Sequence, residues 1–223
     1  VVDIASGKEQ RLTFDGTDLI LNGYASWVYF EEILGRPSKY KAFWWSPDSR
    51  KIGFYRFDNT NVPLFPIYSA FAKDYSGDPS HPTAAPAMSQ SPKVTNLGIG
   101  GSLSETRYPK CGQTNPEVRI GIVEVPSFDP GVRVKSDGSY LIQPDIVWAD
   151  FDPTVDQYFG IPFWGPDSEE FFIARMPRLQ NTIDLYAVNA ADGSKRHVYN
   201  ETYKTWLNWF EGVVFTDKGL YMA

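Results

Sequence analysis

Two adjacent acids, Glu31 and Glu32, are the residues whose types and spacing best suit the binding of a ligand. Apolar residues flank them on both sides, WVYF at 27–30 and IL at 33–34. Neighbouring carboxylates repel each other, and a ligand ammonium group, with its positive charge and N–H donors, can form charge-assisted hydrogen bonds to both. Such a pair is usually hydrated on a protein surface, but the aromatic flank here favours a binding role.

The rest of the sequence holds no recognisable set of catalytic residues. Residues 100–104 (GGSLS) fall one glycine short of the G-x-S-x-G turn that carries a nucleophilic serine. His81 and His197 have no serine and acid in the arrangement of a triad. Cys111 is most simply a small structural residue, and the four aspartates between 145 and 156 lack the glycine and terminal glutamate of a calcium loop. We therefore expect no catalytic residue, no metal and no cofactor in this chain.

Composition indicates an all-β protein. Aromatic side chains make up 16% of the 223 residues, and 17 prolines and 18 glycines punctuate them, which suits many short strands joined by turns. A net charge of −6 argues against nucleic acid, which needs a basic face. The single cysteine excludes an internal disulfide, and no apolar run reaches the roughly 18 residues of a membrane helix. Because the chain opens without a signal peptide and in the middle of a strand pattern, we expect it to be a portion of a longer protein.

Two landmarks repeat along the chain, which predicts an array of similar sheets. The first is a turn before an apolar strand, WSPDS at 45–49 and WGPDS at 164–168. The second is a hairpin at 1–16 and again at 185–201, where Asp192-Gly193 is a strong two-residue turn signal. The expected fold is a set of antiparallel four-stranded blades forming a partial, open β-propeller.

Blade boundaries follow from this repeat, at roughly 40–45 residues per blade. Residues 157–201 make one full blade, residues 1–16 close a blade whose inner strands are missing, residues 42–126 make a blade stretched by an insertion, and residues 210–223 begin another. The insertion, at about 71–104, is rich in Pro, Ser, Ala and Gly and has no sustained period. We expect it to be an exposed excursion without regular structure.

Three motifs occur in an order that resembles one family: WVYFEE at 27–32, WWSPDSRKIGFYRFDNTNVPLFPIY at 44–68, and RYPKCGQTNPEVRIGIV at 107–123. The sequence resembles the N-terminal propeller domain of dipeptidyl peptidase IV and its relatives in the prolyl oligopeptidase superfamily of serine peptidases. The resemblance implies an open propeller with a short helical segment carrying the Glu-Glu motif, and a catalytic α/β-hydrolase domain that is absent from residues 1–223. It further implies a parent exopeptidase that releases Xaa-Pro or Xaa-Ala dipeptides from peptide N-termini.

The resemblance also assigns roles to particular residues. In the family, the acids that match Glu31 and Glu32 grip the free α-amino group of a peptide and so fix which bond reaches the nucleophile. Phe30 stands where relatives often carry a third acid. Phe210 aligns with an aromatic residue that lines the pocket for the second substrate residue, and Glu211 replaces a basic residue of some relatives. Equally, the aromatic residues of the segment 206–210 could belong to the blade core.

The partners implied by the resemblance are a peptide with a free N-terminus, the hydrolase domain of the parent chain and a possible second copy in a homodimer, with no nucleic acid. An exported, periplasmic or cell-surface location is implied as well. The alternative is a non-catalytic propeller, from a peptidase-like homologue, that serves as a platform for protein interactions. An unrelated lectin or scaffold propeller is a third reading, which the three ordered motifs disfavour.

Overall fold

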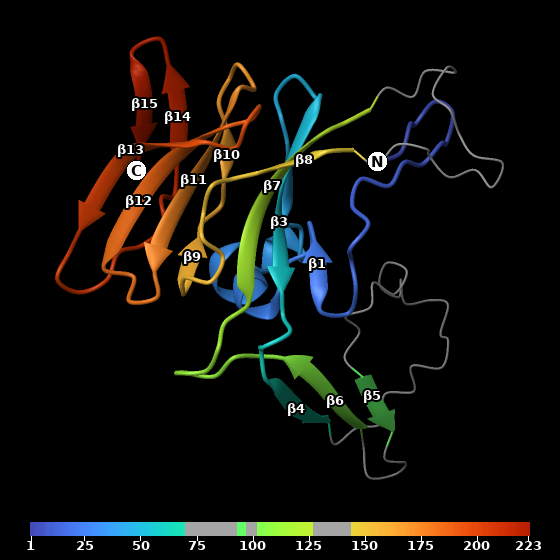
Figure 1. The fold of residues 1–223 in the computed structure, drawn as a ribbon. Helices are drawn as coiled ribbons and strands as arrows, with labels where there is room; N and C mark the ends of the chain where they lie inside the picture. The colour runs from blue at the N-terminus through green and yellow to red at the C-terminus, as the bar shows by residue number, and fades with distance from the viewer. Residues whose placement is uncertain (70–92, 97–101, 127–143) are drawn as a thin grey trace.

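The computed structural model describes residues 1–69, 93–96, 102–126 and 144–223, and two antiparallel sheets form most of it (Figure 1). The first sheet, blade A, contains β1 (Ile20–Asn22), β2 (Phe43–Trp45), β3 (Lys51–Asp58), β7 (Glu117–Glu124) and β8 (Ile146–Trp148). The second, blade B, contains β9 (Gln157–Phe159), β10 (Phe163–Trp164), β11 (Glu170–Pro177), β12 (Thr182–Asn189) and β13 (Lys195–Thr202). The predicted fold class, antiparallel blades of an open propeller, is therefore confirmed.

Both blades break their first strand in the same way. In blade A, β1 and β2 pair with opposite ends of β3, and in blade B, β9 and β10 pair with opposite ends of β11. Each blade therefore contains five strands but is only four strands wide, because two of the strands share one position. The break in blade B is only residues 160–162, whereas the break in blade A holds residues 23–42.

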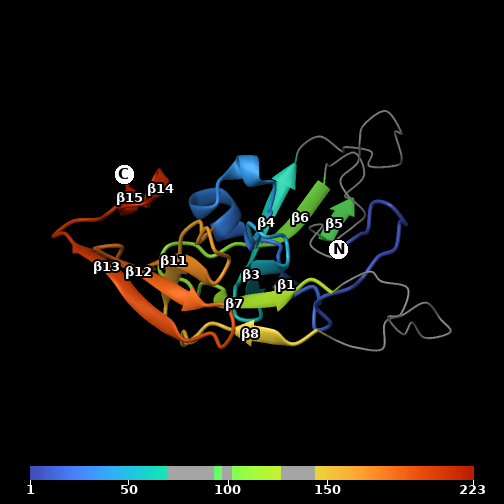
Figure 2. The same cartoon turned by 90° about the horizontal axis from the view of Figure 1, so that it is seen from above.

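The two blades pack face to face through alternating side chains of their second strands. Tyr55 and Phe57 of β3, and Phe171 and Ile173 of β11, are fully buried in one shared cluster between the blades. The intervening residues of each strand point to the opposite face, because successive side chains in a strand alternate. Figure 2 shows the two blades side by side, seen from above.

The repeated turns form the same structure in both blades. The N–H of Ser49 donates to the carbonyl oxygen of Ser46 at 2.9 Å, and that of Ser168 donates to Gly165 at 3.0 Å. Both turns place their last serine in the left-handed region, with φ of 60° at Ser49 and 64° at Ser168. The two turns also touch, since the N–H of Asp48 donates to Oγ of Ser168 at 3.1 Å.

A third sheet interrupts blade A between β3 and β7 (Figure 1). It runs in the order β4 (Leu64–Ser69), β6 (Ser102–Arg107), β5 (Lys93–Asn96). The expectation that residues 71–104 lack regular structure is thus wrong for β5 and for the start of β6. Their polar sequences, KVTN and SLSETR, lack the alternation that identifies a half-buried strand. The remainder of that segment, 70–92 and 97–101, lies outside the described residues.

The two ends of the chain differ from each other. Residues 213–222 form the hairpin of β14 (Val213–Thr216) and β15 (Gly219–Met222), as expected for the beginning of a further blade. Residues 1–16, expected to be a two-stranded hairpin, make a single antiparallel bridge between Val2 and Glu9. No helix in the described ranges is long and apolar enough to cross a membrane.

Candidate functional site

Glu31 and Glu32 lie in a single helical turn, η1 (Tyr29–Ile33), within the insertion that separates β1 from β2. The turn is wide: the N–H of Leu34 donates to the carbonyl oxygen of Tyr29 at 2.7 Å, a five-residue step. Single π-type turns of this kind are frequent at functional sites. The helical segment predicted for the acid pair is confirmed.

Two buried tyrosines tie this turn to blade B. The hydroxyl of Tyr29 accepts a hydrogen bond from the N–H of Phe159 at 3.1 Å, and the hydroxyl of Tyr55 donates to the carbonyl oxygen of Gly160 at 2.6 Å. Burial raises the pKa of both phenols, so they act as neutral hydrogen-bonding groups. The end of β9 therefore holds the acid-bearing turn, and the following residue, Gly160, holds β3.

An aromatic stack supports the turn from its other side. Phe30 stacks on Tyr40 with ring centroids 3.8 Å apart, and Tyr40 stacks on Tyr24 at 4.8 Å. Trp27 meets the edge of Phe30 at 6.1 Å and that of Tyr108, from the third ordered motif, at 5.9 Å. Phe30 is thus a packing residue.

The two acids have different surroundings. Oε1 of Glu31 forms an ion pair with Arg36 in the short helix η2 (Arg36–Ser38), accepting hydrogen bonds from Nη2 and, at 2.9 Å, from Nε. Oε2 of Glu31 is buried without a hydrogen-bond partner. Glu32 is exposed and makes no hydrogen bond or ion pair with the described residues. Glu32 alone is therefore immediately available to a cation.

Glu32 lines a hollow of about 390 Å³ between the helical turn and the segment that follows β13. The turn contributes Val28 and Ile33 to its walls, and blade B contributes Tyr158 and Gln180. The far wall is residues 206–209 (WLNW). Glu32 is the one charged side chain of this lining, so the hollow suits a ligand that joins a cationic group to an apolar one.

The structure brings only some of the predicted binding residues together. Glu32 meets the segment 206–209 across the hollow, whereas Glu31 is directed to Arg36 and is not part of the lining. Phe210 also lies outside the lining: its ring packs against Tyr199 at 6.1 Å and against the second core cluster, behind blade B. A contact of Phe210 with substrate therefore stays a prediction.

Several residues of the site were not anticipated from the sequence. Arg36 carried a usable signal, because it is the first cation after the acid pair, five residues after Glu31. Tyr158 and Gln180 carried none, since they reach the hollow from positions more than 100 residues away along the chain. Trp209 lies in the segment 206–210, which the sequence had singled out for Phe210 instead.

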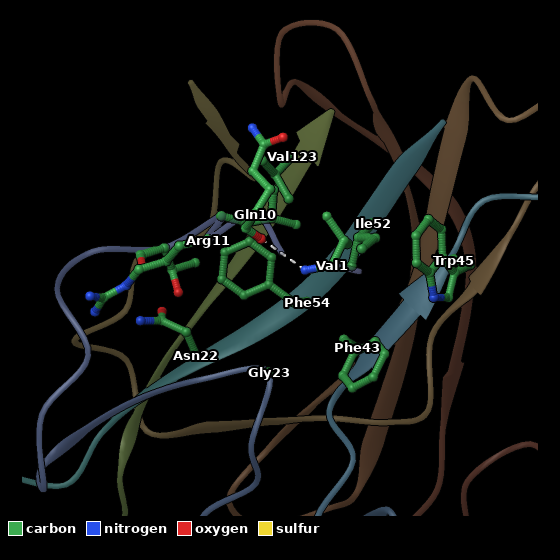
Figure 3. A pocket seen from close by; sticks show the side chains of 12 residues that line it. Val1, Gln10, Arg11, Asn22, Gly23, Phe43, Trp45, Ile52, Phe54 and Val123 are labelled. Atoms are coloured by element: carbon green, nitrogen blue, oxygen red, sulfur yellow. Dashed lines mark hydrogen bonds between the residues drawn. The ribbon is translucent and has the colours of Figure 1, made fainter. Parts of the chain in front are cut away.

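A second hollow, of about 430 Å³, lies on the opposite face of blade A and is lined by Ile52, Phe54 and Trp45 together with the N-terminal segment (Figure 3). By the alignment of the two turns, Ile52 and Phe54 correspond to Phe171 and Ile173, which are buried between the blades. The lining contains no acid. This hollow is therefore a blade-packing face and not a candidate cation site. Within the described ranges, no group of three or more His, Cys, Asp or Glu residues could hold a metal ion.

Comparison with known proteins places these features in one family. The family model described as the dipeptidyl peptidase IV N-terminal region matches residues 1–222. Dipeptidyl peptidase 4 of Bos taurus is 33% identical over 150 residues, covering 63% of this chain and 16% of its own length. Venom dipeptidyl peptidase 4 of Apis mellifera is 29% identical over 200 residues, covering 89% of this chain and 21% of its own length.

The fold agrees with a solved relative. The crystal structure of Porphyromonas gingivalis dipeptidyl peptidase 4 superposes with a TM-score of 0.63 at 19% identity, covering 97% of this chain and 27% of that protein. At this identity the likeness concerns the fold alone. The chain spans about a fifth or less of the bovine and honeybee relatives. Since the family model spans all but the last residue, the chain belongs to the family of the N-terminal region of dipeptidyl peptidase IV.

Proposed function

We propose that this chain is the substrate-gating, amine-binding propeller portion of a serine exopeptidase that releases Xaa-Pro or Xaa-Ala dipeptides from peptide N-termini. The observation that carries the proposal is Glu32, a carboxylate without a partner among the described residues, which lines a hollow that also has tryptophan and aliphatic walls and stands next to a second acid on a fixed helical turn. Family membership supports the reaction class, because the matched relatives are named dipeptidyl peptidases.

In this proposal, Glu32 is the first partner of the substrate ammonium group. Glu31 is the second partner once its side chain turns toward the hollow, because its Oε1 is engaged by Arg36 and its Oε2 is buried without a hydrogen-bond partner. Holding the amine at a fixed point places one peptide bond of the substrate within reach of a nucleophile and lowers the entropic cost of reaction. The nucleophile, acid and base would come from a hydrolase domain in the full-length protein.

The same proposal covers the substrate and the location of the full-length protein. The substrate is a peptide with a free N-terminus, and the full-length protein is exported or displayed at the cell surface. The name of the honeybee relative, a venom protein, is in keeping with that location.

The acid pair is tested in the full-length protein with a Gly-Pro amide substrate. Glu32→Gln keeps the shape of the side chain and removes its charge, so we expect kcat/KM to fall about 10- to 100-fold, the range for one lost hydrogen bond to a charged group. Glu31→Gln should lower kcat/KM less, since Arg36 already satisfies one of its oxygens. Glu124→Gln, at an exposed position on β7 outside the hollow, is the matched control.

Three results would count against the proposal. Unchanged kcat/KM in both Gln variants would remove the amine clamp. Hydrolysis by residues 1–223 alone would refute the division of labour between the two domains. A full-length protein that binds peptides but hydrolyses none would favour the non-catalytic interaction platform instead.

A further inference from the structure

The carboxylate of Glu31 is already bound by a cation from the same insertion. Arg36 donates to one oxygen, Oε1, from Nη2 and, at 2.9 Å, from Nε. The other oxygen, Oε2, is buried and has no hydrogen-bond partner. Because a buried acceptor without a donor is destabilising, the ion pair leaves the carboxylate only half satisfied.

The two partners of this ion pair differ in their contact with water. The side chain of Arg36 is 73% exposed, whereas that of Glu31 is 22% exposed. Breaking the pair returns the guanidinium group to water, and ion pairs with so exposed a member contribute little to stability. The pair therefore orients Glu31 and can still be exchanged for another cation at small cost.

The backbone that carries Arg36 is held in an unusual conformation. Gly35, Lys39 and Tyr40 all have positive φ angles, of 79°, 49° and 67°. Residues other than glycine rarely adopt this region, and they persist there only when their surroundings impose it. The stacking of Tyr40 on Phe30 is such a constraint. An exchange of cations at Glu31 therefore involves side chains and not the backbone of this segment.

Glu31 can reach the hollow from its place on the turn. Val28 and Glu32 both line the hollow, and Glu31 follows Val28 by three residues in continuous helical backbone. Side chains three positions apart on a helix are neighbours. A change of the Glu31 rotamer consequently brings its carboxylate toward the hollow while the turn stays in place.

We infer that Arg36 is a positioning residue that competes with the ammonium group of the peptide for Glu31. The inference rests on the proposed function. In the peptide-free protein Arg36 holds Glu31 away from the hollow, and the ammonium group must replace Arg36 before both acids bind it together. An ammonium group has three N–H donors and can serve two acids at once. Arg36 thus limits the affinity for every peptide with a free N-terminus.

Arg36→Gln in the full-length protein, assayed with a Gly-Pro amide substrate, tests this competition. The change removes the competing charge, so we expect KM to fall about two- to fivefold, the equivalent of one exposed ion pair. The value of kcat should stay the same, because the competition affects the bound substrate and the transition state equally. Arg36→Lys, which keeps a cation, should remain closer to the wild type. Arg196→Gln, which breaks the exposed pair with Glu170 on blade B, is the matched control.

A double variant shows whether Arg36 acts through Glu31. In the wild type Arg36 withholds Glu31 from the substrate, so Glu31→Gln should lower kcat/KM only modestly. In the Arg36→Gln background the same change should lower kcat/KM by a factor about two to five times larger. A purely structural role for Arg36 predicts the opposite, namely a higher KM in Arg36→Gln and no larger effect of Glu31→Gln.

An unchanged or higher KM in Arg36→Gln would overturn the inference. So would an equal effect of Glu31→Gln in the two backgrounds. If Glu32→Gln still lowered kcat/KM in either case, the proposed amine site would stand without competition from Arg36. If neither acid variant changed kcat/KM in either background, the proposed function itself would fail.

Discussion

At the scale of single residues, the site depends on groups that satisfy buried backbone atoms. Tyr29 is almost wholly buried, and its hydroxyl is the partner of the Phe159 N–H. That N–H points away from β11, so no strand of blade B can accept its hydrogen bond. One phenol therefore both fills the core and completes the hydrogen bonding of an otherwise open strand edge.

Replacing this phenol should be costly. Tyr29→Phe keeps the ring and leaves the Phe159 N–H buried without a partner, which should lower the free energy of unfolding by about 1–3 kcal/mol. Urea unfolding of the full-length protein, followed by tryptophan fluorescence, measures the change. Tyr199→Phe, which removes an exposed hydroxyl that bonds Glu201, should have little effect. Equal effects of the two substitutions would contradict this assignment.

A second residue makes stability depend on pH. Burial acts to raise the pKa of Asp15, but hydrogen bonds from Arg56 at 2.7 Å and Asn22 at 2.8 Å outweigh it and hold that pKa below its usual value. In the unfolded chain the pKa of an aspartate is near 3.9, so a lower pKa in the folded protein means that the ionised carboxylate stabilises the fold at higher pH. This stabilisation is lost as the pH falls through the pKa of Asp15 in the folded protein. Asp15 is half exposed, so screening keeps the gain small.

The matching prediction compares Asp15→Asn with the wild type across pH. At pH 7 the variant should unfold with a free energy lower by up to about 1 kcal/mol. The difference should shrink below about pH 4 and vanish once the native carboxyl is protonated. Urea unfolding at pH 7, 5, 4 and 3 measures it. A difference that grew as the pH fell would contradict the prediction.

At the scale of elements, the insertion between β1 and β2 is held by aromatic stacking. Phe30 lies against Tyr40, which in turn lies against Tyr24. Phe30→Glu, which replaces the ring with a third acid beside Glu31 and Glu32, should destabilise the fold by about 1 kcal/mol through the lost stack. Phe30→Tyr, which keeps the stack, is the control, and urea unfolding compares the two. A stable Phe30→Glu variant would show that the stack does not support the turn.

The elements that could be predicted from the sequence are those determined by residues close together in the chain. The turns at 46–49 and 165–168 and the hairpin of β12 and β13 depend on neighbouring residues and were predicted correctly, except that the hairpin loop spans residues 190–194 and is not the two-residue turn expected at Asp192-Gly193. The β4-β6-β5 sheet was missed because its strands do not alternate, and β4 contains Pro66. Pro66 is tolerated because β4 is an edge strand.

The site itself was only half predictable, for the same reason. The acid pair was evident from the run WVYFEE, and its helical turn was implied by the resemblance to the family. The hydrogen bond from Phe159 to Tyr29 and the seat of Trp209 on Gly160 join residues brought together only by the packing of two blades. Such contacts leave no recognisable pattern of residue spacing in a single sequence.

At the scale of the whole molecule, the two blades approach each other closely at a glycine of β3. A Cβ atom at Gly53 of β3 would lie 2.5 Å from the Phe171 ring of β11, so the ring packs flat on the backbone of the neighbouring blade. Phe171 is itself completely buried in the shared cluster. This contact sets how closely blade B approaches blade A.

Adding one methyl group should therefore disturb the whole interface. Gly53→Ala should lower the free energy of unfolding by about 1–3 kcal/mol through overpacking. Combining it with Phe171→Leu, which frees space at the same point, should cost less than the sum of the two single changes. Gly16→Ala, where the nearest atom lies 3.8 Å away, is the control. Strict additivity in urea unfolding would show that the two positions do not meet.

The broken first strand has a consequence for how new recognition can arise in this molecule. Because β3 and β11 each pair with both pieces of a divided neighbour, the segment in the gap can grow from three residues to twenty while every strand keeps its partner. Loop length in such a gap adds only a slowly rising entropic penalty. Ile161, the exposed residue of the break in blade B, is thus a ready grafting point, where a loop inserted after Gly160 could introduce a second specificity while the Gly160 carbonyl keeps its hydrogen bond from Tyr55.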